Sequence, residues 1–303
     1  MKIDCCLILC AGLGTRMGPI GKILPKSLWP LFEKKILDLQ ISFAKSLGIE
    51  KIYINAHHCF EQIKDFVDLY NSKNTIKVKF LHEPTLLGSG GGVHNLAALE
   101  KYQGKLLYLA GDQFYLFDKK YLEIAYNLLN ENEAVLFGLN VNNSDLYNRL
   151  IVENGLLKRI EKPNQISPIT FSGMGLIELK KLKPCPGESS FFDTVANFKE
   201  KNIYIITPKE SEYWDFGTSK NYFDSCFRLL EVKDSRFLEF CIKEGIFEKS
   251  YGTYLGKNLI NLSKKRVDNP KDNKAIVIDY QGDLLEIQHP GIYLNDISER
   301  LSC

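Results

Sequence analysis

A glycine-rich turn followed by an arginine is the first group of residues suited to chemistry. Ala11-Gly12-Leu13-Gly14-Thr15-Arg16 directly follows an apolar run with the character of a buried strand. Its glycines allow backbone N–H groups to approach an anion, and Arg16 adds charge and a planar set of donors. The turn has Met17 where a dinucleotide fingerprint has a third glycine, and Gly21-Lys22 lacks the neighbours of a Walker P-loop. The residues favour an anion site, and a strand-to-helix turn without a ligand is the alternative.

Further charged residues and glycines stand at turns later in the chain. Pro25-Lys26 presents a lysine ten residues after Arg16. Asp112 follows an apolar strand, where a carboxylate can hold a divalent cation in company with phosphates. A capping or turn aspartate is the structural alternative for Asp112. The remaining groups are Gly88-Ser89-Gly90-Gly91-Gly92 before a predicted helix, Glu161-Lys162-Pro163, Phe171-Ser172-Gly173-Met174-Gly175 and Trp214-Asp215-Phe216-Gly217-Thr218.

Composition excludes several classes of protein. The chain has 303 residues, 45% hydrophobic and 25% charged, which is enough for one large domain or two modest ones. Thirty-nine Lys and Arg against 37 Asp and Glu leave a formal charge of +2, so no basic excess indicates a nucleic-acid or membrane partner. The eight cysteines form no C-x-x-C pair, so we expect free thiols. No apolar stretch approaches the roughly 18 residues of a membrane span, so we expect a cytoplasmic protein.

The elements that must position these residues alternate between strands and helices. This alternation predicts an α/β fold, a three-layer sandwich of the Rossmann-like type with helices on both faces of a mixed, mostly parallel sheet. Asn154-Gly155 predicts a hairpin between Arg149–Glu153 and Leu156–Ile160. Predicted strands are Cys5–Cys10, Lys51–Asn55, Ile76–Leu81, Lys105–Ala110 and Ala134–Asn140, and predicted helices are Ile36–Leu47, Phe60–Tyr70, Val93–Tyr102, Lys120–Asn130, Ser190–Lys201 and Ser219–Glu231.

The order of the motifs resembles that of the sugar-1-phosphate nucleotidylyltransferases, whose fold is of this type. The resemblance covers about three-quarters of the chain, from Ile3 to near Leu230. Thr170-Phe171-Ser172-Gly173 and the triple glycine resemble N-acetylmuramate-1-phosphate uridylyltransferases, with mannose- and heptose-1-phosphate guanylyltransferases close behind. The motifs that carry it are Leu9-Cys10-Ala11-Gly12-Leu13-Gly14-Thr15-Arg16-Met17, Pro25-Lys26, Glu83-Pro84, Leu87-Gly88-Ser89-Gly90, Gly111-Asp112, Glu161-Lys162-Pro163, Ser172-Gly173 and Asp215-x-Gly217-Thr218.

The resemblance implies an enzyme that uses Mg²⁺ as cofactor and makes an NDP-sugar and pyrophosphate from a sugar-1-phosphate and an NTP. The NTP is expected to be UTP or GTP. Such chemistry asks for positioning and charge neutralisation rather than a covalent nucleophile. The resemblance implies Arg16, Lys26 and Lys162 as catalytic residues, with Lys26 near the α-phosphate and Lys162 at the sugar phosphate. It also implies nucleotide contacts from Ala11, Gly12, Gly14, Thr15, Glu83 and Gly88, of which Glu83 and Gly88 face the base. It implies sugar contacts from Glu161 and Gly173, and metal ligation by Asp112 and Asp215.

Some positions depart from the family pattern. Trp214 is adjacent to Asp215, whereas the family's tryptophan stands one residue further away, where this chain has Tyr213. Ser27 follows the lysine where proline is usual, and Gln113 follows the first aspartate. A catalytically silent nucleotide-sugar sensor on the same fold is one alternative, although it would not need both metal carboxylates. A choline- or alditol-phosphate cytidylyltransferase is another, which fits Glu161 and Gly173 poorly.

Residues 232–303 differ in character from the rest. We therefore expect a catalytic domain over 1–231 and a C-terminal extension of unknown role over 232–303. The sequence of the extension predicts a helix that ends at Glu248 and a hairpin between Lys274–Ile278 and Leu284–Ile287. We see no internal repeat in it. We expect it to pack on the catalytic domain or at a homodimer contact rather than to form a second active site.

Overall fold

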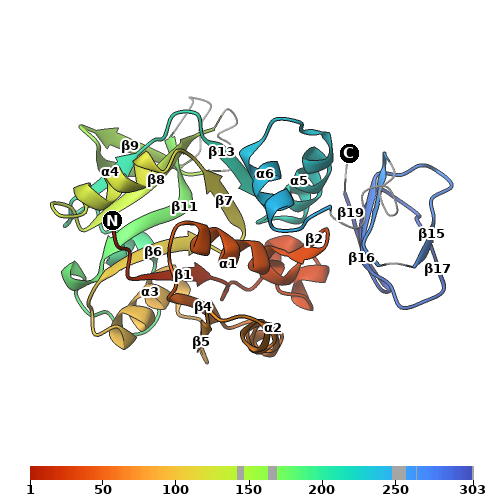
Figure 1. The fold of residues 1–303 in the computed structure, drawn as a ribbon, viewed down its shortest axis with the longest axis horizontal. Coiled ribbons are helices and arrows are strands. Elements are labelled where there is room, and N and C mark those ends of the chain that lie inside the picture. Colours follow the sequence, from red (N-terminus) through yellow and green to blue (C-terminus); the bar gives the residue numbers. More distant parts are fainter. Residues whose placement is uncertain (142–146, 163–168, 248–256, 264, 302–303) are drawn as a thin grey trace. The chain divides into compact units, whose positions relative to one another are not determined.

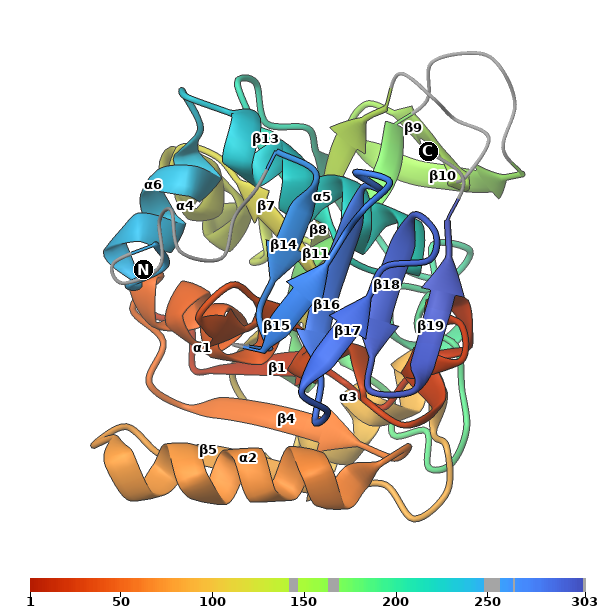
Figure 2. The same cartoon turned by 90° about the vertical axis from the view of Figure 1, so that its right-hand side faces the viewer.

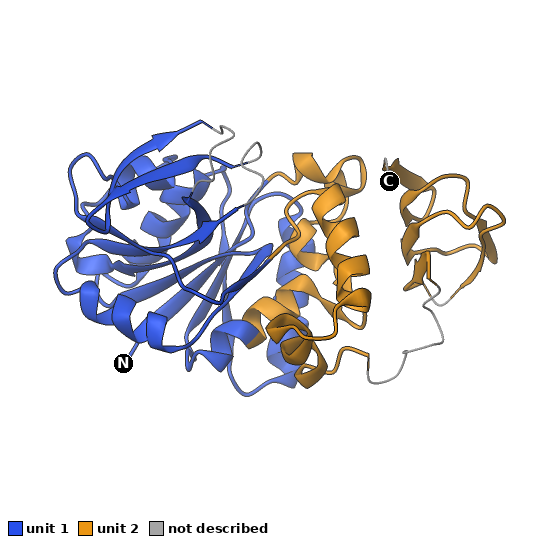
Figure 3. Cartoon of the chain, turned by 90° about the horizontal axis from the view of Figure 1, so that it is seen from above, with its two compact units in different colours: residues 1–12, 43–213 blue, residues 13–42, 214–303 orange. Residues whose placement is uncertain are grey.

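The chain folds into two compact units, each built from two separate segments (Figure 3). The computed structural model describes residues 1–141, 147–162, 169–247, 257–263 and 265–301. The first unit comprises Met1–Gly12 and Phe43–Tyr213, and the second comprises Leu13–Ser42 and Trp214–Cys303. The boundary expected at residue 231 lies inside the second unit, because the helices on either side of it belong to that unit.

A nine-stranded mixed sheet forms the centre of the first unit, in the order β5-β4-β1-β6-β11-β8-β12-β10-β9 (Figure 1). Strands β5, β4, β1 and β6 are parallel, whereas β11 and β10 run antiparallel to their neighbours. The expected mixed, mostly parallel sheet is confirmed. Its strands are β1 Cys5–Leu9, β4 Ile52–Ala56, β5 Val78–His82, β6 Lys105–Ala110, β8 Ala134–Asn140, β9 Arg149–Glu153, β10 Leu156–Glu161, β11 Ile169–Glu178 and β12 Ile203–Ile206.

Apolar side chains on both faces of the central strands hold helices against the sheet. Leu7 lies between Tyr53 of β4 and Tyr108 of β6 in the register of β1. Helix α3 (Gly88–Leu99) packs over β1, and α4 (Lys120–Leu128) packs over β8 and β12 on the opposite face (Figure 1). Helix α2 (Phe60–Lys73) covers β5. The predicted three-layer arrangement follows from these contacts.

Most predicted elements of this unit are confirmed within a few residues, with one exception. The hairpin of β9 and β10 turns at Asn154 and Gly155, which both have positive φ. The helix predicted over Ser190–Lys201 is wrong, because the chain forms only a π-helical turn, η6, over Phe191–Val195. The side chain of Asn197 accepts a hydrogen bond from the backbone of Lys199, an alternative to helical pairing.

The second unit begins with three short 3₁₀ helices and a small hairpin. These are η1 Thr15–Met17, η2 Ile20–Lys22, η3 Lys26–Leu28, β2 Pro30–Leu31 and β3 Lys34–Lys35. Helix α5 (Ser219–Glu231) has the predicted bounds and is followed by α6 (Arg236–Lys243). Trp29 meets Tyr222 of α5 edge to face at 4.8 Å, and the Tyr222 hydroxyl donates to the Pro30 carbonyl at 2.5 Å. Helix α1 (Ile36–Ser46), β7 (Gln113–Leu116) and β13 (Glu212–Asp215) complete the elements before the C-terminal part; α1 and β13 cross the boundary between the units.

The C-terminal part of the second unit is a small parallel β-solenoid rather than a hairpin (Figure 2). Strands β14 (Leu259–Asn261), β16 (Ala275–Asp279) and β18 (Gly291–Leu294) stack in parallel, with residues 259, 275 and 291 in register. Strands β15 (Arg266–Asp268) and β17 (Leu284–Glu286) form a second parallel pair. Strand β19 (Ile297–Arg300) closes the first sheet by pairing antiparallel with β18.

The predicted hairpin between Lys274–Ile278 and Leu284–Ile287 is therefore wrong. Strands β16 and β17 belong to different sheets, and Ala275, Val277 and Ile287 pack together in the core between them. The repeat of 16 residues along β14, β16 and β18 shares only one residue type at matched positions, the isoleucine at 260, 276 and 292. The sequence thus carries too weak a period to be recognised by inspection.

The described residues also show the lengths of the helices and the state of the cysteines. No helix in the described part of the chain is long and apolar enough to cross a membrane. The cysteines of the described residues form no disulfide: Cys5, Cys6, Cys10, Cys59, Cys185, Cys226 and Cys241. Cys5 and Cys6 lie in the sheet core as expected, and burial raises the pKa of the Cys5 thiol to about 12. These thiols pack as small apolar side chains.

Candidate active site

The glycine-rich turn after β1 is held at its start by the first unit. The Cys10 amide donates to Asn55 Oδ1 at 2.8 Å, and Ala11 is buried. Gly12 is exposed, and a Cβ added there would meet nothing within 4 Å. The predicted nucleotide contacts Ala11 and Gly12 therefore stand at the carboxyl end of a central parallel strand, where open sheets of this type bind ligands.

The rest of this turn belongs to the second unit and is shaped by close backbone packing. Gly14 has φ +67°, and a Cβ there would lie 2.8 Å from the Gly21 carbonyl oxygen. A Cβ on Gly21 would lie 2.5 Å from the Gly14 oxygen, so both positions need glycine. Thr15 and Arg16 remain exposed on η1. The two glycines thus fold the loop back on itself and leave the predicted phosphate-binding side chains at the surface.

Lys26 begins η3 directly after the buried Pro25, and its side chain is half-buried. Ser27, which departs from the family pattern, is 1% exposed. The following Trp29 is fully buried and donates from its indole Nε1 to the Leu24 carbonyl at 3.1 Å. Packing on both sides of Lys26 therefore fixes the backbone that carries the predicted catalytic lysine.

The glycine run lies inside α3 instead of before it, which changes the explanation for these residues. Gly88 has φ +69°, and a Cβ there would lie 2.7 Å from the Ser189 carbonyl oxygen. Cβ atoms at Gly90 and Gly91 would lie 2.4 Å from the oxygens of Ser190 and Gly187. The close approach expected for a base or a sugar edge is used here by the protein's own backbone.

Asp112 and Gly173 meet the same end of β6. Asp112 follows β6 and is 4% exposed. Gly173 interrupts the register of β11 with φ +78°, and a Cβ there would lie 2.2 Å from Gln113 Oε1 and 2.8 Å from Ala110 Cβ. The fold therefore brings a predicted metal ligand and a predicted sugar contact to one strand end, although they are 61 positions apart in the sequence.

Glu161 and Lys162 stand at the end of β10. The Glu161 carboxylate lies 3.3 Å from Arg159 Nη2 and 3.8 Å from Arg149 Nη1. Lys162 is exposed, and Pro163 of the predicted motif lies outside the described residues. The two arginines hold the Glu161 side chain on the surface of the β9–β10 hairpin, where it is 37% exposed.

Asp215, the last residue of β13, is oriented by the turn that leads into α5. Its Oδ1 accepts from the Gly217 amide at 2.7 Å, and its Oδ2 accepts from Asn221 Nδ2 at 2.9 Å. Thr218 caps α5 by accepting from the Asn221 amide at 3.0 Å. Trp214 is buried beneath the Arg228 guanidinium, which lies 4.1 Å from the ring centre. Trp214 is thus a packing residue, while Asp215 remains partly exposed.

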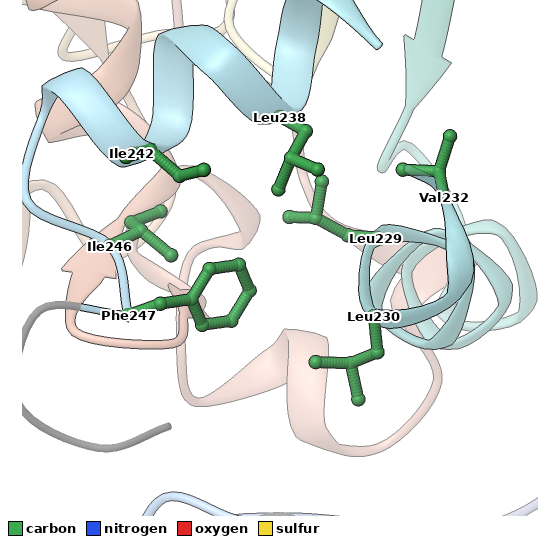
Figure 4. A pocket seen from close by; sticks show the side chains of 7 residues that line it. All are labelled: Leu229, Leu230, Val232, Leu238, Ile242, Ile246 and Phe247. Atoms are coloured by element: carbon green, nitrogen blue, oxygen red, sulfur yellow. The ribbon is translucent and has the colours of Figure 1, made fainter. Parts of the chain in front are cut away.

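An apolar pocket in the second unit is a different kind of cavity (Figure 4). It has a volume of about 310 Å³. The side chains in Figure 4 come from the end of α5 and the residue after it, from α6 and from the turn after α6. All are apolar: Leu229, Leu230, Val232, Leu238, Ile242, Ile246 and Phe247. It offers no cation or hydrogen-bond donor from these side chains, so it does not suit a phosphorylated substrate.

The sequence that carries these residues matches a known protein family. The family model "Nucleotidyl transferase" matches residues 5–225, which include every predicted site residue. The chain belongs to the nucleotidyl transferase family. This confirms the family indicated by the motifs.

Individual relatives of this nucleotidyl transferase agree with the family. D-glycero-alpha-D-manno-heptose 1-phosphate guanylyltransferase of Campylobacter jejuni is 31% identical over 148 residues, 48% of this chain and 62% of that protein. The bifunctional protein GlmU of Methanococcus aeolicus is 29% identical over 238 residues, 74% of this chain and 54% of GlmU. The chain therefore spans less than two-thirds of the length of these curated relatives.

A solved structure shows the same fold. HddC of Yersinia pseudotuberculosis, crystallised with GMP-PN, has a TM-score of 0.62 and 22% identity, and the similarity covers 75% of this chain and 99% of HddC. The predicted fold class is thereby confirmed for the nucleotidyl transferase. The C-terminal solenoid begins at Leu259, beyond the residues 5–225 that the family model matches.

The sequence did not predict that two buried polar residues, Asn55 and Glu83, contact each other. Asn55 and Glu83 join the ends of β4 and β5 through a hydrogen bond from Asn55 Nδ2 to Glu83 Oε1 at 2.7 Å. Glu83 is 0% exposed, so its carboxylate faces protein groups instead of the base that we expected it to face. Their shared position at adjacent strand ends was the only signal that could have linked them.

The predicted metal ligands of this nucleotidyl transferase belong one to each unit, Asp112 to the first and Asp215 to the second. Within the described residues, no group of three or more His, Cys, Asp or Glu side chains gathers as an all-protein metal site. A carboxylate oxygen has two acceptor positions, so an oxygen that accepts one hydrogen bond can also bind a cation. Mg²⁺ in proteins is commonly held by one or two carboxylates together with substrate phosphates, so an aspartate is a residue type that suits this ion.

Proposed function

We propose that this protein is a sugar-1-phosphate nucleotidylyltransferase that makes an NDP-sugar and pyrophosphate from UTP or GTP. The observation that carries the proposal is that Asp112 and Gly173 lie at the same end of β6, in a chain of the nucleotidyl transferase family. The strand next to β6 ends in the Cys10–Gly12 turn. A carboxylate, a glycine with a left-handed φ and a glycine-rich turn at adjacent strand ends are the parts that this reaction needs.

The reaction itself is an in-line displacement at the α-phosphorus of the nucleotide. A phosphate oxygen of the sugar-1-phosphate forms the new bond to the α-phosphorus, and the bond from that phosphorus to the β-phosphate oxygen breaks. The electron pair of that bond leaves with pyrophosphate. A phosphate monoester with a second pKa of about 6 is largely dianionic at neutral pH, so it attacks without a general base.

The chain's own contribution is positioning and positive charge. In this proposal Arg16 binds the departing β- and γ-phosphates, Lys26 the α-phosphate and Lys162 the sugar phosphate. Gly12, Gly14 and Thr15 offer backbone amides to the triphosphate. Asp112 and Asp215 would hold a divalent cation, which when bound neutralises phosphate charge. Each cation or amide acts on charge that develops in the transition state.

The names of the relatives support a choice of substrates to test first. The Campylobacter jejuni relative is named as a heptose 1-phosphate guanylyltransferase, and HddC was crystallised with GMP-PN. These names favour GTP and heptose 1-phosphate, while the Thr170-Phe171-Ser172-Gly173 motif favours UTP and N-acetylmuramate 1-phosphate. We further propose that the enzyme serves nucleotide-sugar synthesis in the cytoplasm, where both substrates are available.

Pyrophosphate release tests the proposal. The full chain would be incubated with Mg²⁺, each of the four NTPs, and the 1-phosphates of heptose, mannose, glucose and N-acetylmuramate. We expect release with one nucleotide and one sugar phosphate, and none without Mg²⁺. Preferred turnover of choline or alditol phosphate with CTP would replace the proposal by a cytidylyltransferase. Binding of an NTP without release from any acceptor in the panel would favour a nucleotide-sugar sensor.

A further inference from the structure

A buried amide–carboxylate pair joins the ends of three neighbouring parallel strands in the first unit. Asn55 is the penultimate residue of β4, and Glu83 directly follows β5. Asn55 Nδ2 donates to Glu83 Oε1 at 2.7 Å, while Asn55 Oδ1 accepts from the Cys10 amide, just beyond β1, at 2.8 Å. Asn55 is 1% exposed and Glu83 is 0% exposed. The pair thus spans β1, β4 and β5 without access to solvent.

The carboxylate also reaches the start of α3. Glu83 Oε2 accepts from the Leu87 amide at 3.3 Å, one residue before that helix begins at Gly88. A negative charge beside a helix amino terminus is stabilised by the aligned peptide dipoles. This end of α3 is therefore occupied by Glu83 and does not serve as an open phosphate site. The network holds the Cys10–Gly12 turn and the Leu87–Gly88 turn at a fixed separation.

The third consecutive glycine of the run makes room for this network. A Cβ on Gly92 would lie 2.9 Å from Asn55 Nδ2 and 3.1 Å from Glu83 Oε1. Contacts this short would push the amide or the carboxylate from its position. Gly88, Gly90 and Gly91 instead face the backbone of residues 187–190. Gly92 is therefore the glycine of the run whose missing side chain is explained by Asn55 and Glu83.

Burial of a carboxylate is costly, which argues that the network has a use beyond filling space. Burial raises the pKa of Glu83, whereas the hydrogen bonds from Asn55 and Leu87 and the nearby His57 lower it. His57 Nδ1 lies 2.8 Å from the Glu83 backbone carbonyl oxygen, so the histidine holds the same segment from outside. A well-packed apolar side chain would stabilise the core as well but would not orient two backbone amides.

We propose that Asn55 and Glu83 are positioning residues of the nucleotide site, which set the affinity for the NTP without touching it. The inference rests on the proposed function, in which the triphosphate binds at the turn that contains Gly12. Asn55 fixes the Cys10 amide and hence the entry to the anion-binding turn. Glu83 fixes Asn55 and the Leu87 amide and hence the turn predicted to face the base.

Binding measurements on the full chain separate this role from a merely structural one. We would measure the NTP dissociation constant by calorimetry, KM for both substrates by pyrophosphate release, and the melting temperature. Asn55→Ala is expected to weaken NTP binding about tenfold, in the range typical of residues that orient a ligand-binding group from behind. The KM for the sugar phosphate is expected to stay unchanged, because in this proposal the two turns bind the nucleotide and not the sugar phosphate.

Asn132→Ala is the matched control. Asn132 is also a buried amide of the first unit, 6% exposed, and its Nδ2 donates to the Leu128 carbonyl at 2.8 Å. It precedes the amino end of β8, at the opposite edge of the sheet from the nucleotide turns. Asn132→Ala is expected to lower the melting temperature without changing the NTP dissociation constant. Equal melting shifts and unchanged NTP affinity in both variants would overturn the proposal.

Two further variants test the connections within the network. Glu83→Gln keeps an acceptor for Asn55 but places an NH₂ group toward the Leu87 amide, so we expect a smaller loss of affinity than in Asn55→Ala. Gly92→Ala is expected to weaken NTP binding alone but to add little in the Asn55→Ala background, because the methyl group then fills vacated space. Full additivity of these two substitutions would overturn the proposed contact.

The measurements distinguish failure of the proposed function from failure of the positioning role. If the wild-type chain binds an NTP but releases no pyrophosphate with any acceptor, the proposed function fails while the affinity changes still test the positioning role. If turnover is present and Asn55→Ala leaves the NTP dissociation constant and KM unchanged, the positioning role fails while the proposed function stands.

Discussion

Replacement of Gly173 by alanine tests the reasoning about the end of β6, because both the backbone angle and the available space there exclude a side chain. Its φ of +78° lies in the left-handed region, which costs a residue with a Cβ about 1–2 kcal/mol. The new methyl group would also lie 2.2 Å from Gln113 Oε1 and 2.8 Å from Ala110 Cβ. Overpacking of this kind costs about 1–3 kcal/mol. We therefore expect Gly173→Ala to lower the free energy of unfolding by about 2–5 kcal/mol.

Gly48→Ala separates the two contributions. Gly48 also has a left-handed φ, +83°, and follows a helix of the same chain, but a Cβ there would meet nothing within 4 Å. Its substitution should cost only the conformational part, about 1–2 kcal/mol. The alanine substitutions share the same effect on the unfolded chain, so the difference of about 1–3 kcal/mol measures the contact with Gln113 and Ala110.

Urea denaturation of both variants, monitored by circular dichroism, gives their free energies of unfolding. Gly173→Ala should also lower kcat/KM for the sugar phosphate, whereas Gly48→Ala should leave it unchanged. Combining Gly173→Ala with Gln113→Ala should recover part of the lost stability, because the nearest clashing atom is removed. Equal losses of stability for Gly173→Ala and Gly48→Ala would refute the packing argument, and no recovery in the double variant would refute the contact with Gln113.

Three further outcomes follow from the described contacts. Asp112→Asn should reduce pyrophosphate release at least ~100-fold with the melting temperature nearly unchanged, whereas an unfolded variant would identify Asp112 as structural. Because burial raises the pKa of Glu83 above its ordinary 4.5, its stabilising effect is present at low pH and lost as pH rises through the raised value. The melting temperature of the wild type minus that of Glu83→Gln should therefore fall as pH rises from 4.5, and a constant difference across pH would contradict a buried carboxylate. Thr218→Ala should cost about 1 kcal/mol and roughly 2 °C of melting temperature, whereas Thr218→Ser should not, since only alanine removes the cap of α5; equal melting temperatures for the two variants would argue against the cap.

The elements that the sequence predicts correctly are those specified by a few consecutive residues. Strands β1, β4, β6 and β8 were predicted from short runs of apolar residues, because strands buried on both faces of a sheet require them. Helix α5 has the predicted bounds, and the structure shows that the Thr218 side chain caps its start. The β9–β10 hairpin was predicted from Asn154-Gly155, which tolerates the positive φ of the turn.

The errors arose where distant segments determine the local conformation. The helix predicted over Ser190–Lys201 is replaced by a π-turn, in which Phe191 packs against Tyr108 of β6 and Phe171 of β11. The parallel pairs β14–β16, β15–β17 and β16–β18 join residues 15 to 18 positions apart instead of neighbouring strands, because their apolar side chains fill a core between two sheets. Local pattern alone favours the nearest partner, and only the packed core selects the other.

The sequence by itself determined the family, the alternation of strands and helices, and the residue types that phosphate chemistry needs at strand ends. These properties are local, because a glycine turn, a capped helix or an apolar strand is specified by a few consecutive residues. Only the tertiary structure decided that Gly92 makes room for Asn55 and Glu83, that Gly173 lies against Gln113, and that Glu83 is buried. Such contacts join residues tens of positions apart, and their free energy depends on burial and distance, which exist only once the sheet has formed.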